Sequence, residues 1–186
     1  MLLFAECYAN ECLAQKLAQN LKDVEEITIR HKEVYGRDTI IKILKKILAG
    51  EFKSPLVEGA LVIIVIIDYE KGDARKYIDN FFSQRQVITE GVVLGTIRRV
   101  RKKIVAVIFD PNIEEAFLCK ISDKLCRTES VHKRIKSKNA RSFLEEFLES
   151  NNAKRLIELI SQKVLDVIGP VSYTHLRAHE TRHDLV

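Results

Sequence analysis

Three absences narrow what this chain of 186 residues can be. No apolar run approaches the roughly 20 residues needed to cross a bilayer, so we expect no membrane partner. The N-terminus has no basic leader and meets a glutamate at position 6, so we do not expect a signal peptide. The phosphate-loop pattern G-x-x-x-x-G-K-[ST] is missing, which disfavours a nucleotide-binding protein of that type.

Cysteine is scarce, and its spacing excludes the common metal motifs. The four cysteines are Cys7, Cys12, Cys119 and Cys126, and no C-x-x-C pair occurs. Their intervals match no zinc motif, so we expect reduced thiols in a cytoplasmic protein. A metal site built from Cys119, Cys126 and His132 is the weaker alternative, because buried free cysteine is common.

Composition and charge are those of a globular protein with a slight basic bias. Hydrophobic residues make up 46% of the chain and charged residues 31%, which argues against disorder. A chain of this length can form one good core and a small appendage. The net charge of +5 permits a nucleic-acid partner but does not require one.

Apolar runs and helical periodicity alternate along the chain. We expect strands at residues 2–5, 27–31, 61–67, 92–97 and 104–109, the last two as a hairpin or bent pair. We expect helices capped by Asn10, Asp38 and Asp73, another starting at Pro111, and two more at residues 140–149 and 153–168. This alternation predicts an α/β fold with a mostly parallel, Rossmann-like sheet flanked by helices and a helical C-terminal extension. The continuous apolar run 61–67 predicts a central strand.

The character of the sequence changes twice. Residues 1–122 carry the α/β pattern, residues 123–170 form a basic helical extension that we expect to be truncated, and residues 171–186 fit neither. The segment VSYTHLRAHET closely resembles translated sequencing-adapter DNA, so we interpret 171–186 as a non-native tail. The alternative is a metal-binding tail in which His175, His179 and His183 align on one helix face.

Acidic side chains follow the ends of three expected strands. Glu6, Asp68 and Asp110 each come just after the last apolar residue of a strand, and Glu70 lies two residues beyond Asp68. Ligands bind beyond the carboxyl ends of the strands in parallel sheets, and residues 68 and 70 point the same way along an extended chain. Carboxylate oxygens suit Mg²⁺ or Mn²⁺. The alternative is that these acids are ordinary strand-end charges in solvent.

Three motifs resemble those of the TOPRIM (topoisomerase–primase) family. The segment AECYANECLAQKL, residues 5–17, is similar to the first motif of the family, a strand that ends in glutamate and leads into a helix. VYGRDTIIKIL, residues 34–44, is similar to the glycine turn and helix after the second strand. VIIVIIDYEKGDAR, residues 62–75, is similar to the D-x-D motif. The resemblance covers residues 1–118 in the order and spacing of the family.

The motifs depart from the family pattern at three positions. Cys7 replaces the usual glycine, Glu70 replaces the second aspartate, and Gly72 comes one residue early. No candidate tyrosine nucleophile stands out, so the small standalone and nuclease-like members are nearer than the topoisomerases. Additional site candidates by the same resemblance are Asp110 and Glu114 in FDPNIEEAF and Glu11 in the first motif.

The resemblance implies metal-dependent phosphodiester chemistry on nucleic acid. The glutamate of the first motif is assigned proton transfer in this family, which makes Glu6 the candidate catalytic residue. Asp68, Glu70 and Glu6 would hold a Mg²⁺ or Mn²⁺ ion that stabilises charge on phosphoryl oxygens. We expect nuclease-like hydrolysis of DNA or RNA. The first alternative is a non-catalytic TOPRIM-like binding module in a repair or recombination complex. A phosphoacceptor regulatory domain fits less well, because it needs paired acids after the first strand.

Basic residues supply candidate contacts to the substrate. The phosphate-binding candidates are Lys71, Arg75 and Arg37, and the candidates for contacts to the nucleic-acid backbone are Arg98, Arg99, Arg101, Lys102, Lys133 and Arg134. For each, the alternative is an ordinary surface charge. No aromatic residue is interleaved in these basic stretches, so stacking on single strands is not expected. The sequence leaves the oligomeric state open, and a homo-oligomer is compatible with it.

Overall fold

The structure, a computed structural model, describes residues 1–24, 37–53, 55–60, 62–70, 72–97, 103–126 and 128–169. Several expected features lie outside these ranges: the strand at 27–31, Lys71, the tail 171–186, and the basic residues Arg98, Arg99, Arg101 and Lys102. The acidic residues expected at the strand ends all lie within the described ranges.

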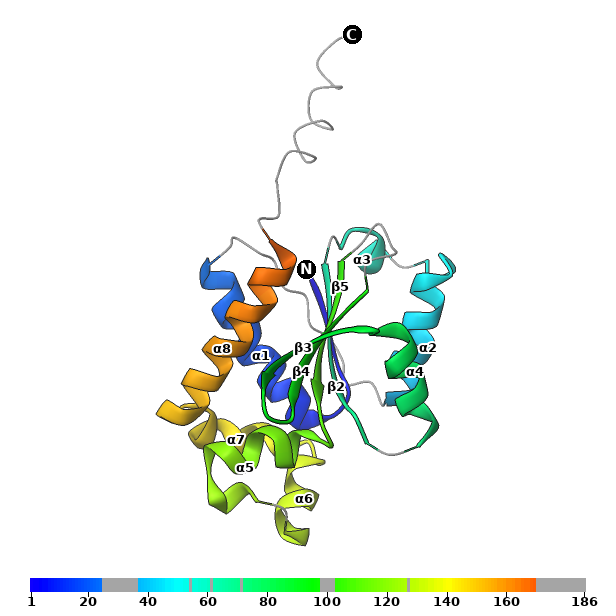
Figure 1. The fold of residues 1–186 in the computed structure, drawn as a ribbon. Coiled ribbons are helices and arrows are strands. Elements are labelled where there is room, and N and C mark those ends of the chain that lie inside the picture. Colours follow the sequence, from blue (N-terminus) through cyan, green and yellow to red (C-terminus); the bar gives the residue numbers. More distant parts are fainter. Residues whose placement is uncertain are drawn as a thin grey trace.

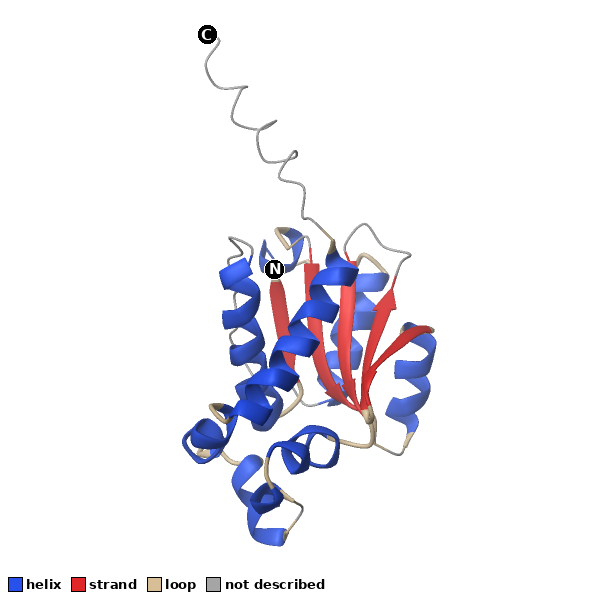
Figure 2. Cartoon of the chain, turned by 60° about the vertical axis from the view of Figure 1, so that its left-hand side comes forward, coloured by secondary structure: helices blue, strands red, loops and turns tan. Residues whose placement is uncertain are grey.

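The described strands form one mixed sheet (Figure 2). They are β1 (Leu2–Ala5), β2 (Val62–Asp68), β3 (Gln84–Thr89), β4 (Val92–Ile97) and β5 (Lys103–Phe109), in the spatial order β1-β2-β5-β4-β3. The strands β1, β2 and β5 are parallel, whereas β4 and β3 are antiparallel to their neighbours. The expected α/β class is therefore confirmed, and the sheet is parallel where β2 lies between its two partners.

The strands expected at residues 2–5, 61–67, 92–97 and 104–109 are confirmed as β1, β2, β4 and β5, and one observed strand was not predicted. All seven residues of β2 are buried, as its continuous apolar run requires of a central strand covered on both faces. The strands β4 and β5 pair as an antiparallel hairpin. Strand β3 was not expected, because its sequence QRQVIT is polar and its first four residues are exposed at the side of the sheet.

Helices cover both faces of the sheet (Figure 1). Their bounds are α1 (Tyr8–Val24), α2 (Arg37–Leu48), α3 (Pro55–Glu58), α4 (Asp73–Phe81), the π-helix η1 (Glu114–Leu118), α5 (Cys119–Ile121), the 3₁₀-helix η2 (Asp123–Leu125), α6 (Glu129–Ile135), α7 (Ala140–Leu148) and α8 (Asn151–Ile168). In Figure 1, α1 and α8 lie on one side of the sheet and α2 and α4 on the other. The two helices expected near the C-terminus are confirmed as α7 and α8.

Three expected helix starts are wrong by one or a few residues. Helix α1 begins at Tyr8, so Asn10 lies inside its first turn and does not cap it. Helix α2 begins one residue before Asp38, and Gly72 rather than Asp73 precedes α4 as its N-cap residue. The correction at Asn10 matters for function, because its side chain is freed from capping and is buried instead.

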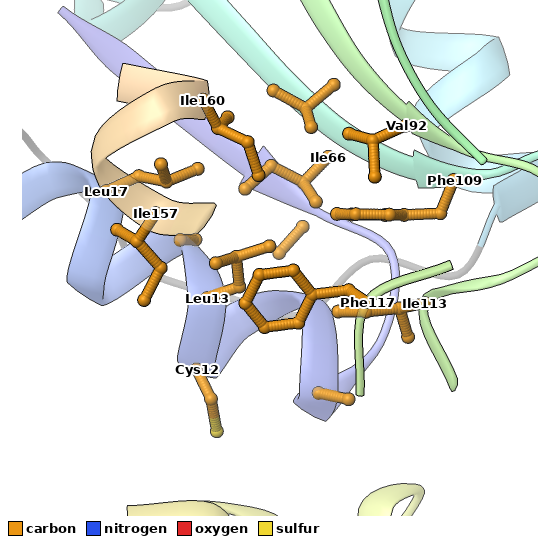
Figure 3. Close-up of a cluster of buried hydrophobic side chains, with 14 of the residues drawn as sticks. Cys12, Leu13, Leu17, Ile66, Val92, Phe109, Ile113, Phe117, Ile157 and Ile160 are labelled. Atoms are coloured by element: carbon orange, nitrogen blue, oxygen red, sulfur yellow. The ribbon is translucent and has the colours of Figure 1, made fainter. Parts of the chain in front are cut away.

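The C-terminal helices belong to the same hydrophobic core as one face of the sheet. Figure 3 shows Ile157 and Ile160 of α8 with Leu13 of α1, Ile66 of β2 and Phe117 of η1. A second core cluster lies on the opposite face, against α2 and α4. The division into residues 1–122 and 123–170 stays a prediction about domains, but the helices after residue 123 pack directly into the α/β core.

The carboxyl ends of β2 and β5 point to the end of the molecule where α5, α6 and α7 lie (Figure 1). The chain reaches this position because η1 and α5 follow β5 after a short turn. The helical extension therefore lies next to the strand ends where the acids were predicted. Among the described helices, none is long and apolar enough to cross a membrane.

We predict that α8 contributes strongly to stability through its buried face. Ile160 is 0% exposed whereas its neighbour Leu159 is 39% exposed. The substitution Ile160→Ala should lower the free energy of unfolding by about 2–4 kcal/mol, because it removes buried methyl groups and leaves a cavity. Leu159→Ala is the matched control and should change it by less than about 1 kcal/mol. Urea unfolding measures both, and equal small effects would show that α8 is not part of the core.

Candidate functional site

Glu6 and Asp68 are neighbours at the carboxyl edge of the parallel strands. Ala5 is paired with Ile66 in the β1–β2 register, so Glu6 follows directly alongside the end of β2. The Glu6 Oε2 atom accepts a hydrogen bond from the backbone N–H of Asp68 at 2.8 Å. The parallel pairing of two adjacent strands thus brings together two acids that lie 62 positions apart in the sequence.

Asp68 is enclosed at this edge and held by several hydrogen bonds. It is only 6% exposed, and its Oδ1 atom accepts hydrogen bonds from the backbone N–H of Ile113 at 3.0 Å and from Asn10 Nδ2 at 3.4 Å. Asn10 is fully buried, and its Oδ1 atom has no hydrogen-bond partner among the described residues. Asp68 Oδ1 is therefore fixed in position by the side-chain amide of Asn10, and the oxygen of that same amide has no partner among the described residues.

Burial, together with nearby negative charges, raises the pKa values of both acids. Burial is the main cause at Asp68, and the negative charges of Glu6 and Glu114 raise its pKa further. Burial likewise raises the pKa of Glu6 to about 7, although the Asp68 N–H, Arg37 and Lys136 act in the opposite direction. Both acids therefore hold a proton more tightly than a carboxyl group in water does.

Glu114 brings a histidine to the same edge. It is the first residue of η1, which follows β5 after a short turn, and is 4% exposed. Its Oε1 atom lies 3.2 Å from Nδ1 of His132, which belongs to α6. Since the charge of Glu114 also acts on Asp68, the carboxylate connects the Glu6–Asp68 pair with the helical extension.

One face of α6 is directed at the acidic edge, the end of the sheet where Glu6, Asp68 and Glu114 lie. The Thr128 side chain caps this helix by accepting a hydrogen bond from Val131 N–H at 3.3 Å, and Val131 and Ile135 are buried in the core. His132 contacts Glu114, and the charge of Lys136, four positions later, acts on Glu6. Residues four apart lie on the same face of a helix, so both basic side chains belong to the surface that meets the acids.

The sequence did not identify several of the residues that surround the acids. Lys136 was part of the basic stretch but was not singled out, and His132 was considered only as a zinc ligand with Cys119 and Cys126. Their spacing of four residues was the available signal. Nothing in the sequence indicated that Asn10 would face Asp68, because that contact depends on how α1 packs across the end of β2.

Two predicted residues of the site are paired with each other. Glu70 Oε2 lies 3.3 Å from Nη1 of Arg37, which is the first residue of α2. Its charge also raises the pKa of Glu6, so Glu70 belongs to the edge. Arg37 keeps a buried Nε with no hydrogen-bond partner in the described part of the chain. The predicted phosphate contact Arg37 is thus close to the acids.

The remaining predicted residues point elsewhere. Arg75 lies over the Tyr69 ring, 4.2 Å from its centroid, and Asp110 is exposed with its charge acting on Arg75. Glu11 accepts a hydrogen bond from Gln15 within α1 at 3.3 Å. Among the predicted nucleic-acid contacts, Lys133 pairs with Glu129 at 2.6 Å and Arg134 lies over the Phe143 ring at 5.1 Å.

The described side chains do not form a complete metal-binding site. Within the described ranges, no group of three or more His, Cys, Asp or Glu side chains is placed to hold a metal ion. None of the four cysteines, all of which the structure describes, forms a disulfide bond, and burial together with the charge of Asp68 raises the pKa of the Cys7 thiol. A zinc site at Cys119, Cys126 and His132 is therefore not formed, and any metal site here would use few protein ligands.

Comparison with known proteins adds no family to this description. No family model, curated protein or solved structure matches the chain. The TOPRIM resemblance rests on the sequence motifs, and the site rests on the geometry of its own residues.

We predict that the acidic edge makes the metal-free protein less stable as the pH rises. The pKa of Glu6 is higher in the folded protein than its ordinary 4.5, so the folded state holds the proton more tightly. The free energy of unfolding should fall as the pH rises from about 4.5 to about 7 and then level off. The raised pKa of Asp68 acts in the same direction.

The substitution Asp68→Asn isolates this effect, because an amide oxygen can still accept the bonds from Ile113 and Asn10. In EDTA at pH 8 the variant should be more stable than the parent by roughly 1–3 kcal/mol, and at pH 4 the difference should shrink. Asp166→Asn, at an exposed acid of α8 with a lowered pKa, is the control that should give no gain. Thermal unfolding at both pH values would contradict the account if Asp68→Asn were destabilising at pH 8.

Proposed function

We propose that this protein is a TOPRIM-like enzyme that hydrolyses phosphodiester bonds of DNA or RNA with the help of Mg²⁺ or Mn²⁺. The observation that carries the proposal is the contact between the half-buried Glu6 and the buried Asp68 at the carboxyl edge of parallel strands, where α/β folds bind their ligands. The order of the sequence motifs and the expected Rossmann-like topology support the same family.

The side chains at the edge fit a divalent ion held by few protein ligands. Mg²⁺ is commonly bound through one or two carboxylates and keeps several of its waters. Asp68 Oδ1 and Glu6 Oε2 are fixed by backbone N–H groups, and the second oxygen of each has no hydrogen-bond partner among the described residues. Asn10 Oδ1 adds a buried oxygen for which the described residues supply no hydrogen-bond partner. A cation at these oxygens would favour the ionised forms of both acids, which burial and nearby negative charges disfavour.

The contacts of each side chain determine the role that it would have in the reaction. A bound ion of this kind stabilises negative charge on the phosphoryl oxygens. Asp68, held by Ile113 N–H and Asn10, is the candidate ligand with the most fixed position. Glu6 has a pKa of about 7, which suits a group that takes up and releases a proton near neutral pH. Glu70, already paired with Arg37, would act at the rim.

One observation favours the alternative of a non-catalytic TOPRIM-like binding module. The Glu70–Arg37 ion pair gives one of the three expected metal ligands a cation from the chain itself. A protein with this site could hold nucleic acid in a repair or recombination complex without cleaving it. Metal affinity separates the two functions, because only the enzyme needs the ion.

The test is a calorimetric titration of Mn²⁺ into the full chain and its Asp68→Asn variant. We expect one site in the parent and at least a tenfold loss of affinity in the variant. Glu149→Gln is the control, since this exposed acid pairs with Lys16 and Lys154 and the variant should bind as the parent does. The tail histidines are the same in all three proteins, so the difference reports the acidic edge.

A well-folded parent whose Mn²⁺ binding is identical to that of Asp68→Asn would refute the catalytic proposal. If the parent binds, Mn²⁺-dependent cleavage of labelled DNA and RNA oligonucleotides follows. Glu6→Gln should then reduce the cleavage rate by about 100-fold or more while retaining the fold, as expected of a proton-transferring group.

A further inference from the structure

We propose that His132 of α6 and Lys136, the C-cap residue of this helix, bind a phosphate group of the nucleic-acid backbone next to the acidic edge. This inference rests on the proposed function and names where its substrate is held. It differs from the sequence expectation, which placed backbone contacts at Lys133 and Arg134 of the same helix.

The contact between Glu114 and His132 fixes the histidine with one nitrogen turned to the carboxylate. Nδ1 of His132 lies 3.2 Å from Oε1 of the buried Glu114, which positions the ring. The imidazole side chain is 33% exposed, and Nε2 has no hydrogen-bond partner in the part of the chain that the structure describes. A ring that carries a proton at Nε2 donates from this nitrogen to a ligand oxygen.

Lys136, at the C-terminal end of α6, has a positive charge that is available to a ligand. Lys133 is neutralised by Glu129 at 2.6 Å, and Arg134 lies over the Phe143 ring. Lys136 is exposed, and its ammonium forms no ion pair among the described residues. Its charge nevertheless acts on Glu6, so it lies near enough to the acids to influence them.

The acidic edge needs such cations if it is to receive a phosphodiester. Glu6, Asp68, Glu70 and Glu114 repel an approaching phosphate, and a single divalent ion offsets only part of that charge. A lysine and a histidine one helical turn apart place two donors on one side of the acids. The phosphate would then be held between these donors and the metal-binding oxygens, as phosphate contacts position a nucleic acid without reading its sequence.

The test measures binding of labelled 20-nucleotide DNA duplex and single-stranded RNA by fluorescence anisotropy in the presence of Ca²⁺. Lys136→Gln and His132→Gln should each weaken binding about 5- to 20-fold. Lys136→Gln should also reduce the slope of log K against log salt by about 0.9 for the duplex or about 0.7 for the single strand. Lys136→Arg should restore affinity. Lys163→Gln, on α8 and paired with Asp166, is the control and should leave binding unchanged.

The outcomes separate this inference from the proposed function. If the parent binds Mn²⁺ but Lys136→Gln and His132→Gln bind nucleic acid with the affinity and salt slope of the parent, the inference is wrong and the metal site stands. A parent that binds no nucleic acid also overturns it. If the variants lose nucleic-acid binding and the parent binds no Mn²⁺, the α6 surface is supported and the catalytic function is refuted.

Discussion

The parallel pairing of β1 with β2 is the constraint on which the candidate site depends. It sets Ala5 opposite Ile66, so the next residue, Glu6, reaches the backbone N–H of Asp68. A half-buried and a buried acid thereby meet at the end of a sheet whose central strand is completely buried. Burial in turn raises both pKa values, so the two acids hold protons tightly at the place where a parallel sheet opens to ligands.

The helical extension completes this edge rather than standing apart from it. Helices α7 and α8 pack into the core beside α1, which fixes the position of the shorter α6. Through Val131 and Ile135 the core then holds His132 and Lys136 against the acids. Negative charge comes from the strand ends and positive charge from the extension, so a ligand with both a cation and a phosphate would match the two sides.

The sequence predicted the features that depend on local pattern. The continuous apolar run before Asp68 predicted the central strand, and acids at strand ends predicted that Glu6 and Asp68 would meet. The sequence did not predict contacts between residues that are far apart along the chain. Asn10 was expected to cap a helix but contacts Asp68, and nothing in the sequence indicated that His132 would contact Glu114. Strand β3 was missed because its polar residues lie exposed at the side of the sheet, where hydrophobic alternation is not required.

The most direct test of the central claim is to find where Mn²⁺ binds by its paramagnetic broadening of NMR signals. Substoichiometric Mn²⁺ added to the ¹⁵N-labelled full chain should broaden the backbone amides of Asp68 and Ile113 and the side-chain amide of Asn10 first. The Asp68 N–H donates to Glu6 Oε2, and the Ile113 N–H and the Asn10 amide donate to Asp68 Oδ1, so all three donors contact the two proposed ligands. Broadening confined to residues 171–186, with their three histidines, would contradict the account and leave the acidic edge without a metal.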